Sequence, residues 1–570
     1  MHAAEGATSA VAGSDQRVPY LATFSLLILL SLLLFFYRLG ALSLFDADEP
    51  AFAEAAREML LSGDYITPHF NFQPRFDKPI LWYWLIILAY KGFGIGEFAA
   101  RCWSATFATG LVVTIYLFGR QVLSPRGALI AALAFAANVG TAILARAAVT
   151  DMALTFFVTL ALVCFFSAVR AADSARRQGL LLIAYPAMAL AVLTKGPIGL
   201  LIPLFIIGLL VMIRGRVGAS LSRLRLLTGF PLFAAIALPW YLLVFNANGW
   251  DFVQGFLVKH HLVRYTGVIS GHGGPIYYFL PVVVIGFFPW SGMLPKAFGE
   301  LWSARGRLRG DLTPREELLL FGWLWFGVTF LFFSLSGTKL PSYIFPAFPA
   351  LALLAGAAGE TLLEGEGHAG KWGTSFDWLV GGIGVSLSVA LVLLPFILGS
   401  IRLREAPDIP PFGLGLTPYL LAILFVLGPI IVVWARRRGR GDLALAALAT
   451  TMVLCLLVAV HRVAPAIHEG LQMALREFAD LARRELGPGD LLVAYDLNAP
   501  SLVFYARRQV VTVRRGQEVK FQALAASAGR LLIIGKAASE TRLREVPDIF
   551  PLDRQGGYVL YSSRPPTISP

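Results

Sequence analysis

The feature that most constrains this chain is a succession of long apolar runs. A helix that crosses the hydrocarbon core of a bilayer needs about 20 predominantly apolar residues. The sequence contains thirteen such runs, at 19–38, 98–119, 127–145, 151–170, 178–194, 197–213, 225–245, 278–298, 316–335, 342–358, 376–399, 415–435 and 442–461. Charged residues make up only 15% of the 570 residues, which is too little to cover several soluble domains. We therefore expect an α-helical polytopic membrane protein.

The excess of basic residues gives the expected orientation of these runs. In a soluble chain, a net charge of +13 would suggest nucleic-acid binding. Here the arginines gather in loops between apolar runs, as they do in the cytoplasmic loops of membrane proteins. All the Arg-rich loops fall on one side if the short aromatic run at 80–93 lies in the membrane interface instead of crossing. The segments expected on the outer side are 39–97, 146–151, 195–197, 246–277, 336–341 and everything after 461.

The two ends of the chain have different characters. Leu21 to Tyr37 is long enough to span and no small-residue cleavage site follows it, so we expect a signal anchor. Residues 1–461 form the membrane domain, and 462–570 are expected to form a soluble α/β domain in which helical and β-rich patterns alternate. The helical patterns lie at 467–486 and 517–528, and the β-rich runs at 491–495, 509–513, 531–534 and 558–561. This domain has no nucleotide-binding fingerprint, and the three cysteines of the chain all lie in apolar runs, so we expect no disulfide framework.

Acidic residues cluster directly after the first apolar run. Asp48, Glu49 and Glu54 lie in the first outer loop of a chain that is otherwise poor in charge. One interpretation is the start of a helix, where acidic side chains meet the positive end of the dipole. Because the cluster lies at a membrane surface, the alternative interpretation is a functional site.

The same loop then places opposite charges beside aromatic residues. Arg75, Asp77 and Lys78 precede an aromatic segment that includes Tyr83. The pattern is typical of an interface anchor, since Trp and Tyr prefer that depth. It equally fits a phosphate or sugar-phosphate site, in which Arg75 and Lys78 supply positive charge.

The remaining outer loops each contribute isolated charges. Asp151 lies at the mouth of an apolar run, where a carboxylate indicates either helix capping or function. Lys195 ends one run and has almost no loop after it. The further candidates are Arg264, Lys339 and Tyr343, together with His260 and His261. Two adjacent histidines do not face the same way on a helix, so a tight zinc site is not expected, although Asp77 with one histidine could hold a divalent ion weakly.

These charges share one chemical interpretation. Acidic groups beside cations at a membrane surface suit a substrate with a phosphate head and a lipid body. The cations would hold a departing phosphate, and a carboxylate would orient or deprotonate the attacking group or stabilise positive charge at a sugar carbon.

The order of these motifs resembles a known family. The run from Asp48 to Met59, then Gly63-Asp64 and Phe76 to Trp84, is similar to the first periplasmic loop of the polyprenyl-phosphate-sugar glycosyltransferases, within the protein mannosyltransferase-like superfamily. Within that group the chain most resembles the aminoarabinose transferases of lipid A. The likeness continues through Asp151, 194–197, the loop at 261–265 and Pro289-Trp290, and so covers about the first 350 residues. Two positions depart from the usual pattern without removing a charge: Ile80 replaces a second proline, and Asp77 stands where Glu is frequent.

The resemblance implies a GT-C enzyme of the bacterial inner membrane with a periplasmic active site. It would transfer 4-amino-4-deoxy-L-arabinose from undecaprenyl phosphate to a lipid A phosphate, with inversion, and so confer resistance to polymyxin and cationic peptides. Under this hypothesis Asp48 orients the acceptor or takes its residual proton. Lys78, Lys195 and Arg264 bind the donor phosphate, and Asp151 orients one of these cations or the sugar amino group.

Other expectations follow for partners and for rival functions. No cofactor is required, the partners are the lipid-linked donor, lipid A and membrane lipids, and we expect a monomer that binds no nucleic acid. One alternative is a transferase of the same fold with another lipid-linked sugar or acceptor. The other is a lipid transporter or flippase, against which stand the absence of an inverted repeat and the gathering of charges at one surface.

Overall fold

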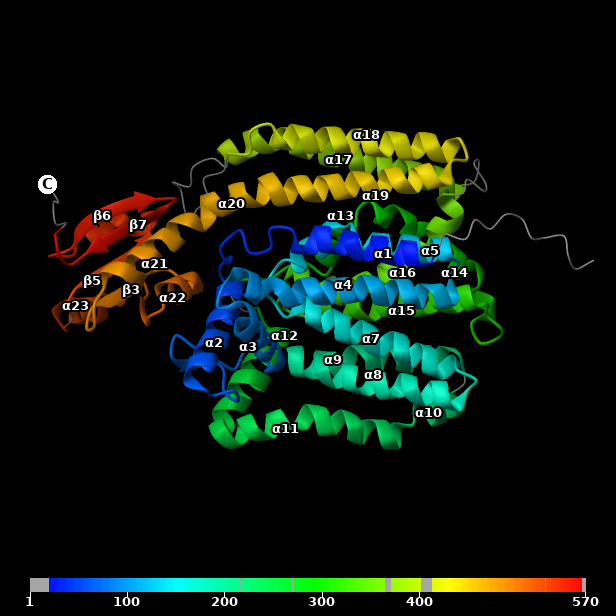
Figure 1. The fold of residues 1–570 in the computed structure, drawn as a ribbon, viewed down its shortest axis with the longest axis horizontal. Helices are drawn as coiled ribbons and strands as arrows, with labels where there is room; N and C mark the ends of the chain where they lie inside the picture. The colour runs from blue at the N-terminus through cyan, green and yellow to red at the C-terminus, as the bar shows by residue number, and fades with distance from the viewer. Residues whose placement is uncertain are drawn as a thin grey trace, which may run out of the picture.

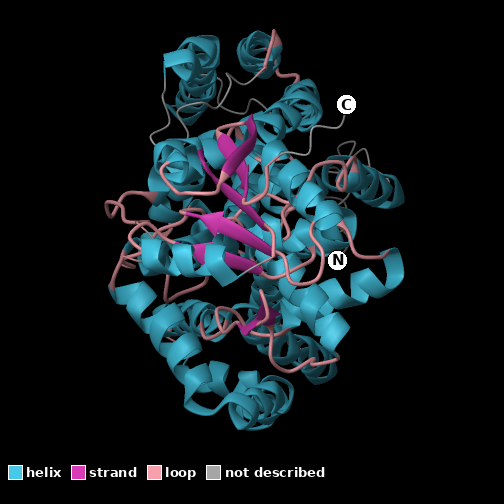
Figure 2. Ribbon diagram, turned by 90° about the vertical axis from the view of Figure 1, so that its left-hand side faces the viewer, coloured by secondary structure: helices cyan, strands magenta, loops and turns pink. Residues whose placement is uncertain are grey.

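Long helices lie side by side in a bundle, and a smaller domain built from C-terminal residues covers one end of it (Figure 1). The computed structural model describes residues 20–215, 217–268, 271–363, 371–400, 413–527 and 529–565. We call the covered end the domain end of the bundle. Viewed from this side, the strands of the smaller domain lie in front of the helices (Figure 2). The predicted helical membrane architecture with a C-terminal α/β domain is therefore confirmed.

Each predicted apolar run contains a helix or a broken helix. In chain order these are α1 (Tyr20–Ser31) with η1 (Leu32–Phe36), α4 (Glu97–Val122), α5 (Pro125–Ala136) with α6 (Val139–Leu144), α7 (Asp151–Arg170), α8 (Ser174–Lys195), α9 (Ile198–Ile213), α11 (Leu226–Val253), α13 (Phe279–Gly286) with η3 (Trp290–Met293) and α14 (Leu294–Ser303), α15 (Pro314–Ser334), η5 (Pro341–Ala347) with α16 (Phe348–Leu363), α17 (Lys371–Ser400), α18 (Thr417–Arg437) and α19 (Gly441–Val458). Within the described ranges, nine helices are long and apolar enough to cross a membrane, or ten if one bent pair is a single span. The expected number of thirteen crossings stays a prediction.

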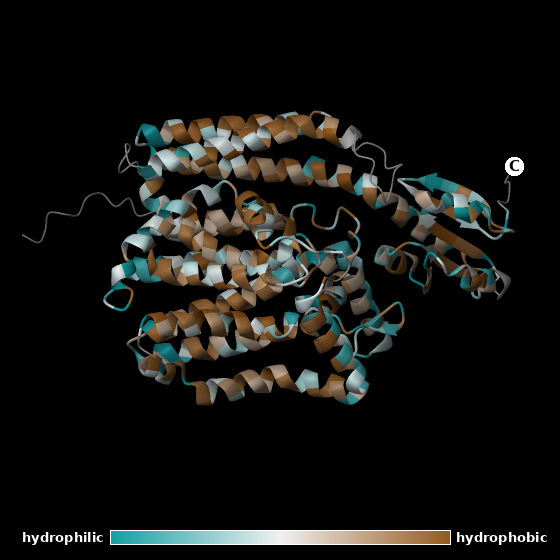
Figure 3. Cartoon of the chain, turned by 180° about the vertical axis from the view of Figure 1, so that it is seen from behind, coloured by the Kyte–Doolittle hydropathy of each residue, from teal (hydrophilic) through white to brown (hydrophobic). Residues whose placement is uncertain are grey.

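Apolar residues cover much of the bundle, and polar residues gather at its two ends (Figure 3).

Two of the predicted runs are interrupted. α13 and the segment Trp290–Ser303 meet at an angle of 104°. Pro289 lies at this break, and a proline cannot donate the backbone N–H that a continuous helix requires. α5 and α6 are separated at Ala137 and Asn138, where the side chain of Asn138 accepts a hydrogen bond from the backbone N–H of Thr141 and caps α6.

The Arg-rich connections gather at the end of the bundle opposite the C-terminal domain. Figure 1 places α10 (Val217–Leu224) at this end. Ion pairs join separate connections here: Arg170 lies 2.5 Å from Glu317, Arg214 lies 3.5 Å from the same carboxylate, and Arg126 lies 3.1 Å from Asp442. The predicted segregation of arginines to one end is therefore present in the fold.

The first outer loop folds between the bundle and the C-terminal domain. It contains α2 (Asp48–Ser62), the antiparallel strands β1 (His69–Phe70) and β2 (Gln73–Pro74), and α3 (Leu81–Phe93). α3 is a separate helix of 13 residues, about 20 Å long, whereas the hydrocarbon core is about 30 Å thick. Its length therefore agrees with the prediction that 80–93 does not cross.

The C-terminal domain contains a five-stranded sheet in the order β4-β3-β5-β7-β6. β3 (Leu491–Tyr495) pairs in parallel with β4 (Val510–Val513) and with β5 (Leu531–Lys536), whereas β7 (Tyr558–Ser562) is antiparallel to β5 and β6 (Phe550–Gln555). The helices are α21 (Met473–Glu485), α22 (Pro500–Ala506), α23 (Glu518–Ser527) and α24 (Glu540–Arg544). The sequence patterns did not predict α22 or β6. β6 is a largely exposed edge strand, so it lacks the alternation of apolar residues by which strands are recognised.

The two parts of the chain are joined by helix. α19 continues through η6 (Ala459–Val463) into α20 (Ala464–Leu471), and together they form one run of 31 residues. The predicted boundary at 461/462 thus lies inside a continuous helical segment. This connection brings α20 and α22 against the loop that begins at residue 37.

Candidate active site

Asp48 is the first residue of α2 and lies at the domain end of the bundle. Its side chain is exposed, and among the described residues it makes no side-chain hydrogen bond or ion pair. The first turn of a helix favours a negative charge, because unpaired backbone N–H groups point toward it. Its charge acts on that of Arg75. Asp48 is therefore an ionisable group that is available to a substrate.

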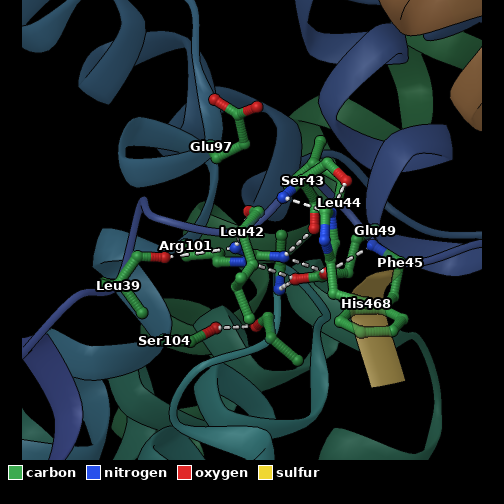
Figure 4. A network of polar contacts seen from close by, with 12 residues as sticks. Leu39, Leu42, Ser43, Leu44, Phe45, Glu49, Glu97, Arg101, Ser104 and His468 are labelled. Atoms are coloured by element: carbon green, nitrogen blue, oxygen red, sulfur yellow. Dashed lines mark hydrogen bonds and ion pairs between the residues drawn. The ribbon is translucent and has the colours of Figure 1, made fainter. Parts of the chain in front are cut away.

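Glu49, the next residue, is fully engaged with the protein (Figure 4). Its carboxylate accepts two hydrogen bonds from Arg101, at 2.6 and 2.8 Å, and one each from the backbone N–H groups of Phe45 and Ala148. Arg101 also donates to the backbone carbonyls of the loop at 39–43. Glu49 is 5% exposed and Arg101 4%. The predicted supporting role of Glu49 is therefore a structural one: it joins α2 to α4 and to the loop before α7.

Glu54 is likewise turned into the protein. It is 0% exposed and pairs with Arg57 at 2.5 Å, one turn along α2. Burial raises the pKa of Glu54 to about 7, although Arg57 partly opposes this shift. The structure gives Glu54 no contact with the other candidate residues.

Arg75, Asp77 and Tyr83 form one compact group. Arg75 donates two hydrogen bonds of 2.7 Å to Asp77, and the hydroxyl of Tyr83 donates a third at 3.2 Å. Burial alone would raise the pKa of the Asp77 carboxyl, but the guanidinium of Arg75 outweighs burial and holds this pKa well below its usual range. Arg75 also lies over the ring of Phe52, at 5.0 Å. The charge of Arg75 is thus largely balanced by Asp77.

Asp151 and Lys195 meet where α7 begins and α8 ends. The ammonium of Lys195 donates to the Asp151 carboxylate at 2.7 Å. Gly196 follows with a φ of 81°, and a Cβ atom at this position would lie 2.6 Å from Nε2 of His261. Only glycine satisfies both conditions, so it allows the chain to turn directly into α9 while Lys195 points into the site.

Three cations converge beside these pairs. The ring of Tyr343 lies 5.2 Å from the Lys195 ammonium and 5.8 Å from the Arg264 guanidinium. Lys78 is half-buried, and its pKa is lowered to about 8: loss of solvent around it is the main cause, and the charges of Lys195 and Arg264 add to it, while Asp77 opposes it. The site therefore holds Lys78, Lys195 and Arg264 close together, and among the described residues Asp151 is the one carboxylate that forms an ion pair with any of them. Such an excess of positive charge suits an anionic ligand.

His260, His261 and Lys339 are the remaining candidates from the sequence. Nδ1 of His261 lies 2.7 Å from the carbonyl oxygen of Phe256, and His260 lies near Asp77. In the described part of the chain, no group of three or more His, Cys, Asp or Glu side chains is placed to hold a metal. The predicted weak ion site therefore remains a prediction. The ammonium of Lys339 donates to the carbonyl of Ser336 in its own loop, and the backbone N–H of Lys339 donates to the carbonyl of His272 at 2.8 Å.

Sequence reasoning missed several residues that shape this end of the molecule. Arg101 lies within a predicted span, and a charge in an apolar run was the signal that could have found it. Arg57 pairs locally with Glu54, at a spacing of three residues that would have indicated the pair. His468, Ser501 and Tyr505 of the C-terminal domain contact the loop before Asp48, more than 420 residues away in sequence. No local pattern gives contacts of this kind.

Comparison with known proteins places this geometry in context. Residues 21–252 match a family described as dolichyl-phosphate-mannose-protein mannosyltransferase. An undecaprenyl phosphate-α-4-amino-4-deoxy-L-arabinose arabinosyl transferase of Edwardsiella ictaluri is 32% identical over 406 residues, which is 70% of each chain. A transferase of the same description from Pseudomonas aeruginosa is 34% identical over 343 residues, or 59% of each chain. The alignment thus spans between three fifths and seven tenths of these relatives.

Two solved structures share the architecture. ArnT from Cupriavidus metallidurans bound to undecaprenyl phosphate matches with a TM-score of 0.80 and 26% identity, and the match covers 97% of this chain and all of that one. An oligosaccharyltransferase of Archaeoglobus fulgidus matches with a TM-score of 0.51 and 13% identity over 93% of this chain and 71% of that one. The second likeness concerns the fold alone.

Proposed function

Since this chain belongs to the family of undecaprenyl phosphate-α-4-amino-4-deoxy-L-arabinose arabinosyl transferases, we propose that its site transfers aminoarabinose from undecaprenyl phosphate to a phosphate of lipid A. The chain is a multi-pass membrane glycosyltransferase that uses a lipid-linked sugar. The proposal adds the acceptor, the inner membrane as location, and the periplasm as the side on which the domain end lies. Capping a lipid A phosphate with an amino sugar lowers the negative charge of the outer membrane and so gives resistance to polymyxin and cationic peptides.

One observation carries the proposal: an unengaged carboxylate, Asp48, lies at the same end of the bundle as an excess of cations. Asp48 interacts electrostatically with Arg75, and Arg75 binds Asp77, next to Lys78. Lys78 in turn feels the charges of Lys195 and Arg264. This order of groups matches a donor phosphate on one side of the reacting carbon and an acceptor on the other.

The reaction is a single displacement at the anomeric carbon of the sugar. An oxygen of the acceptor phosphate forms a bond to this carbon, and the bond to the oxygen of undecaprenyl phosphate breaks. The departing phosphate leaves with the bonding electrons, and a single displacement inverts the configuration. Lys78, Lys195 and Arg264 stabilise the negative charge that grows on the departing phosphate.

Asp48 has a limited task in this reaction. The second pKa of a phosphate monoester is about 6, so the acceptor is already largely anionic at neutral pH and needs no strong base. Asp48 therefore orients the acceptor or takes its residual proton. Asp151 holds the ammonium of Lys195 in place through the 2.7 Å contact.

Mass spectrometry of lipid A from cells with and without the gene tests the proposed substrates. We expect a gain of aminoarabinose only in cells that express the chain. Lipid A that gains a different sugar would indicate another lipid-linked donor, and unchanged lipid A would remove lipid A as the acceptor.

The variant Asp48→Asn tests the proposed site. It should abolish transfer and leave the affinity for undecaprenyl phosphate unchanged, because the cations that bind the phosphate remain. Asp251→Asn is the matched control, since it removes an exposed carboxylate from another outer loop and should keep full activity. Activity of Asp48→Asn close to that of the wild type would contradict the assignment.

A further inference from the structure

The segment that leads into Asp48 is held between two parts of the molecule. It runs from residue 37 to Ala47 and has no regular helix or strand of its own. On the bundle side, Arg101 of α4 binds the carbonyls of Leu39, Leu42 and Ser43. On the other side, four of its last five residues contact the C-terminal domain. We call residues 43–46 the clamped segment.

The contacts of the clamped segment come from α20 and α22. The backbone N–H of Ser43 donates to Nε2 of His468 at 3.2 Å, and its hydroxyl contacts the same nitrogen. The backbone N–H of Leu44 donates to the hydroxyl of Tyr505 at 2.8 Å. His468, Ser43 and Leu44 are seen together beside Glu49 and Arg101 in Figure 4.

Of these contacts, the one made by Asp46 is nearest to Asp48 in the sequence. Its Oδ1 accepts from the backbone N–H of Ser501 at 2.8 Å, and its Oδ2 accepts from the Ser501 hydroxyl. Ser501 lies in the first turn of α22, where backbone N–H groups lack partners within the helix. The residue before α22 is Ala499, whose side chain cannot cap it. Asp46 therefore supplies, from 455 residues away in sequence, the acceptor that this helix end lacks.

The C-terminal residues are themselves held in place. Ser501 and Tyr505 are both buried, in a helix whose residues are all buried. The hydroxyl of Tyr505 also donates to Glu97 at the start of α4, at 3.1 Å, and Arg476 of α21 lies 3.2 Å from the same carboxylate. Asn71 of the first loop exchanges two hydrogen bonds with the backbone of Val510, at 2.8 and 2.9 Å. The domain is thus fixed to the bundle at several points around the clamped segment.

From this arrangement we infer that the C-terminal domain positions Asp48, and that Ser501 and Tyr505 are positioning residues that act through Asp46 and Leu44. The inference rests on the proposed function of Asp48. Within the described part of the chain, the Asp48 side chain makes no hydrogen bond or ion pair, so its place depends on the backbone on either side of it. Glu49 fixes the side that follows, and the clamped segment fixes the side that precedes. A displacement of about 1 Å at a reacting group can reduce a rate about 100-fold, so a small change in the clamped segment has a large effect.

The ionisation of Asp46 supports this geometry. Burial raises its pKa to about 6, the two hydrogen bonds from Ser501 lower it, and the charge of Glu49 raises it again. At neutral pH the carboxylate is therefore mostly ionised and accepts both bonds. Loss of the Ser501 hydroxyl would favour the protonated form of Asp46, in which one carboxyl oxygen carries the proton and is a weaker acceptor.

The first experiment compares variants of Ser501 in the full-length protein. With undecaprenyl phosphate-linked aminoarabinose and lipid A as substrates, Ser501→Ala should lower kcat about 10- to 100-fold with little change in KM for the donor. Ser501→Thr keeps the hydroxyl and should recover most of the activity. Ser562→Ala removes another buried serine hydroxyl of the same domain, on β7, and should retain wild-type kcat. Equal kcat for Ser501→Ala and Ser562→Ala would overturn the inference.

The second experiment asks whether Ser501 acts through Asp46. If it does, Asp46→Ala/Ser501→Ala should lose no more activity than Asp46→Ala alone, because the two substitutions break the same contact. Multiplied losses would show that Ser501 acts by another route. Tyr505→Phe should lower kcat by a smaller factor, and Tyr561→Phe, which alters a buried tyrosine on β7, is its matched control.

A third measurement separates failure of this inference from failure of the proposed function. Hydrogen–deuterium exchange of the peptide that contains residues 43–49 needs no substrate. Exchange should become faster in Ser501→Ala and stay unchanged in Ser562→Ala. If exchange is unaffected, the C-terminal domain does not hold the segment and the inference is wrong. If exchange rises but Asp48→Asn is active, the clamp exists and the proposed role of Asp48 is the part that fails.

Discussion

Two carboxylate–cation pairs lie at the same end of this molecule and differ in how completely they are satisfied. Glu49 receives four hydrogen bonds, two of them from Arg101, and no other cation acts on this pair through a short contact. Asp151 forms one ion pair among the described residues, with Lys195, whose ammonium lies over the ring of Tyr343 and acts on Lys78 together with Arg264. Burial does not distinguish them well, since Glu49 is 5% exposed and Asp151 7%.

The difference teaches how to separate structural charges from functional ones in a membrane protein. Intramembrane and membrane-edge charges all invite a functional reading. A pair whose hydrogen bonds are saturated by the protein has nothing left to offer a ligand. An ion pair that lies within an excess of positive charge can still attract a ligand of negative charge. By this criterion we expect Glu49–Arg101 to stabilise the fold and Asp151–Lys195 to take part in binding.

The largest expected effect comes from breaking the saturated pair. Arg101→Met leaves Glu49 as an unpaired buried charge and frees the carbonyls of the loop before Asp48. We expect a loss of about 3–5 kcal/mol in the free energy of unfolding, seen as a lower thermal midpoint and as aggregation in size-exclusion chromatography.

The matched control for Arg101→Met is Arg307→Met. Arg307 pairs with Glu316 at the opposite end of the bundle, and its side chain is 58% exposed. An exposed pair contributes at most about 1 kcal/mol, so this variant should unfold close to the wild type. Equal thermal midpoints for the two variants would abolish the distinction between the pairs.

A smaller effect is expected from breaking the Asp151–Lys195 pair, and it should fall mainly on activity. Lys195→Met should lower kcat/KM about 100-fold, because it removes a charge that we propose stabilises the departing phosphate. It also leaves Asp151 unpaired, so stability should fall as well. In Asp151→Asn/Lys195→Met the uncompensated charge is gone, and we expect stability to return without activity. Recovery of activity in this double variant would show that the pair is merely structural.

Lys296→Met is the control for Lys195→Met. Lys296 pairs with Glu300 at 3.3 Å, and its side chain is 16% exposed, against 15% for Lys195. It lies among the arginines at the other end of the bundle. Its loss should leave kcat/KM unchanged, so a decrease in this variant would indicate a general effect of removing a lysine.

The smallest expected effect is a pH dependence of donor binding. The pKa of Lys78 is lowered to about 8, so the ammonium is present below this pH and is lost as the pH rises through it. If only the charged form binds, affinity for undecaprenyl phosphate should fall about tenfold between pH 7 and pH 9. Lys78→Arg keeps its charge throughout this range and should flatten the profile. A decrease that persists in Lys78→Arg would assign the titration to another group.

Much of the site could be predicted from the sequence because charges are rare in this chain. Asp48, Lys78, Asp151, Lys195 and Arg264 stand out against apolar surroundings, and their order along the chain resembles one family. The structure brings the last four together and leaves Asp48 exposed beside Arg75. Lys339 stood out by the same criterion, but its ammonium binds a carbonyl of its own loop. An isolated charge is therefore a guide to position and not to role.

Which of two neighbouring acidic residues is exposed and which is buried could not be predicted in this way. Asp48 and Glu49 are adjacent in sequence and chemically alike, but one is exposed and the other is buried against Arg101. Successive residues of a helix point about 100° apart, so which of them meets the bundle depends on how α2 is placed against α4. That placement is a property of packing between distant segments.

By itself, the sequence determined which runs are helical, where the arginines gather, and which charges lie at the membrane surface. These features depend on local composition, because each apolar run must bury its own backbone polar groups in a helix within a bilayer. Only the tertiary structure decided that three distant loops bring one cluster of cations together and that Asp46 caps α22. Contacts of this kind join residues up to 461 positions apart. They depend on how whole helices pack, which local composition does not record.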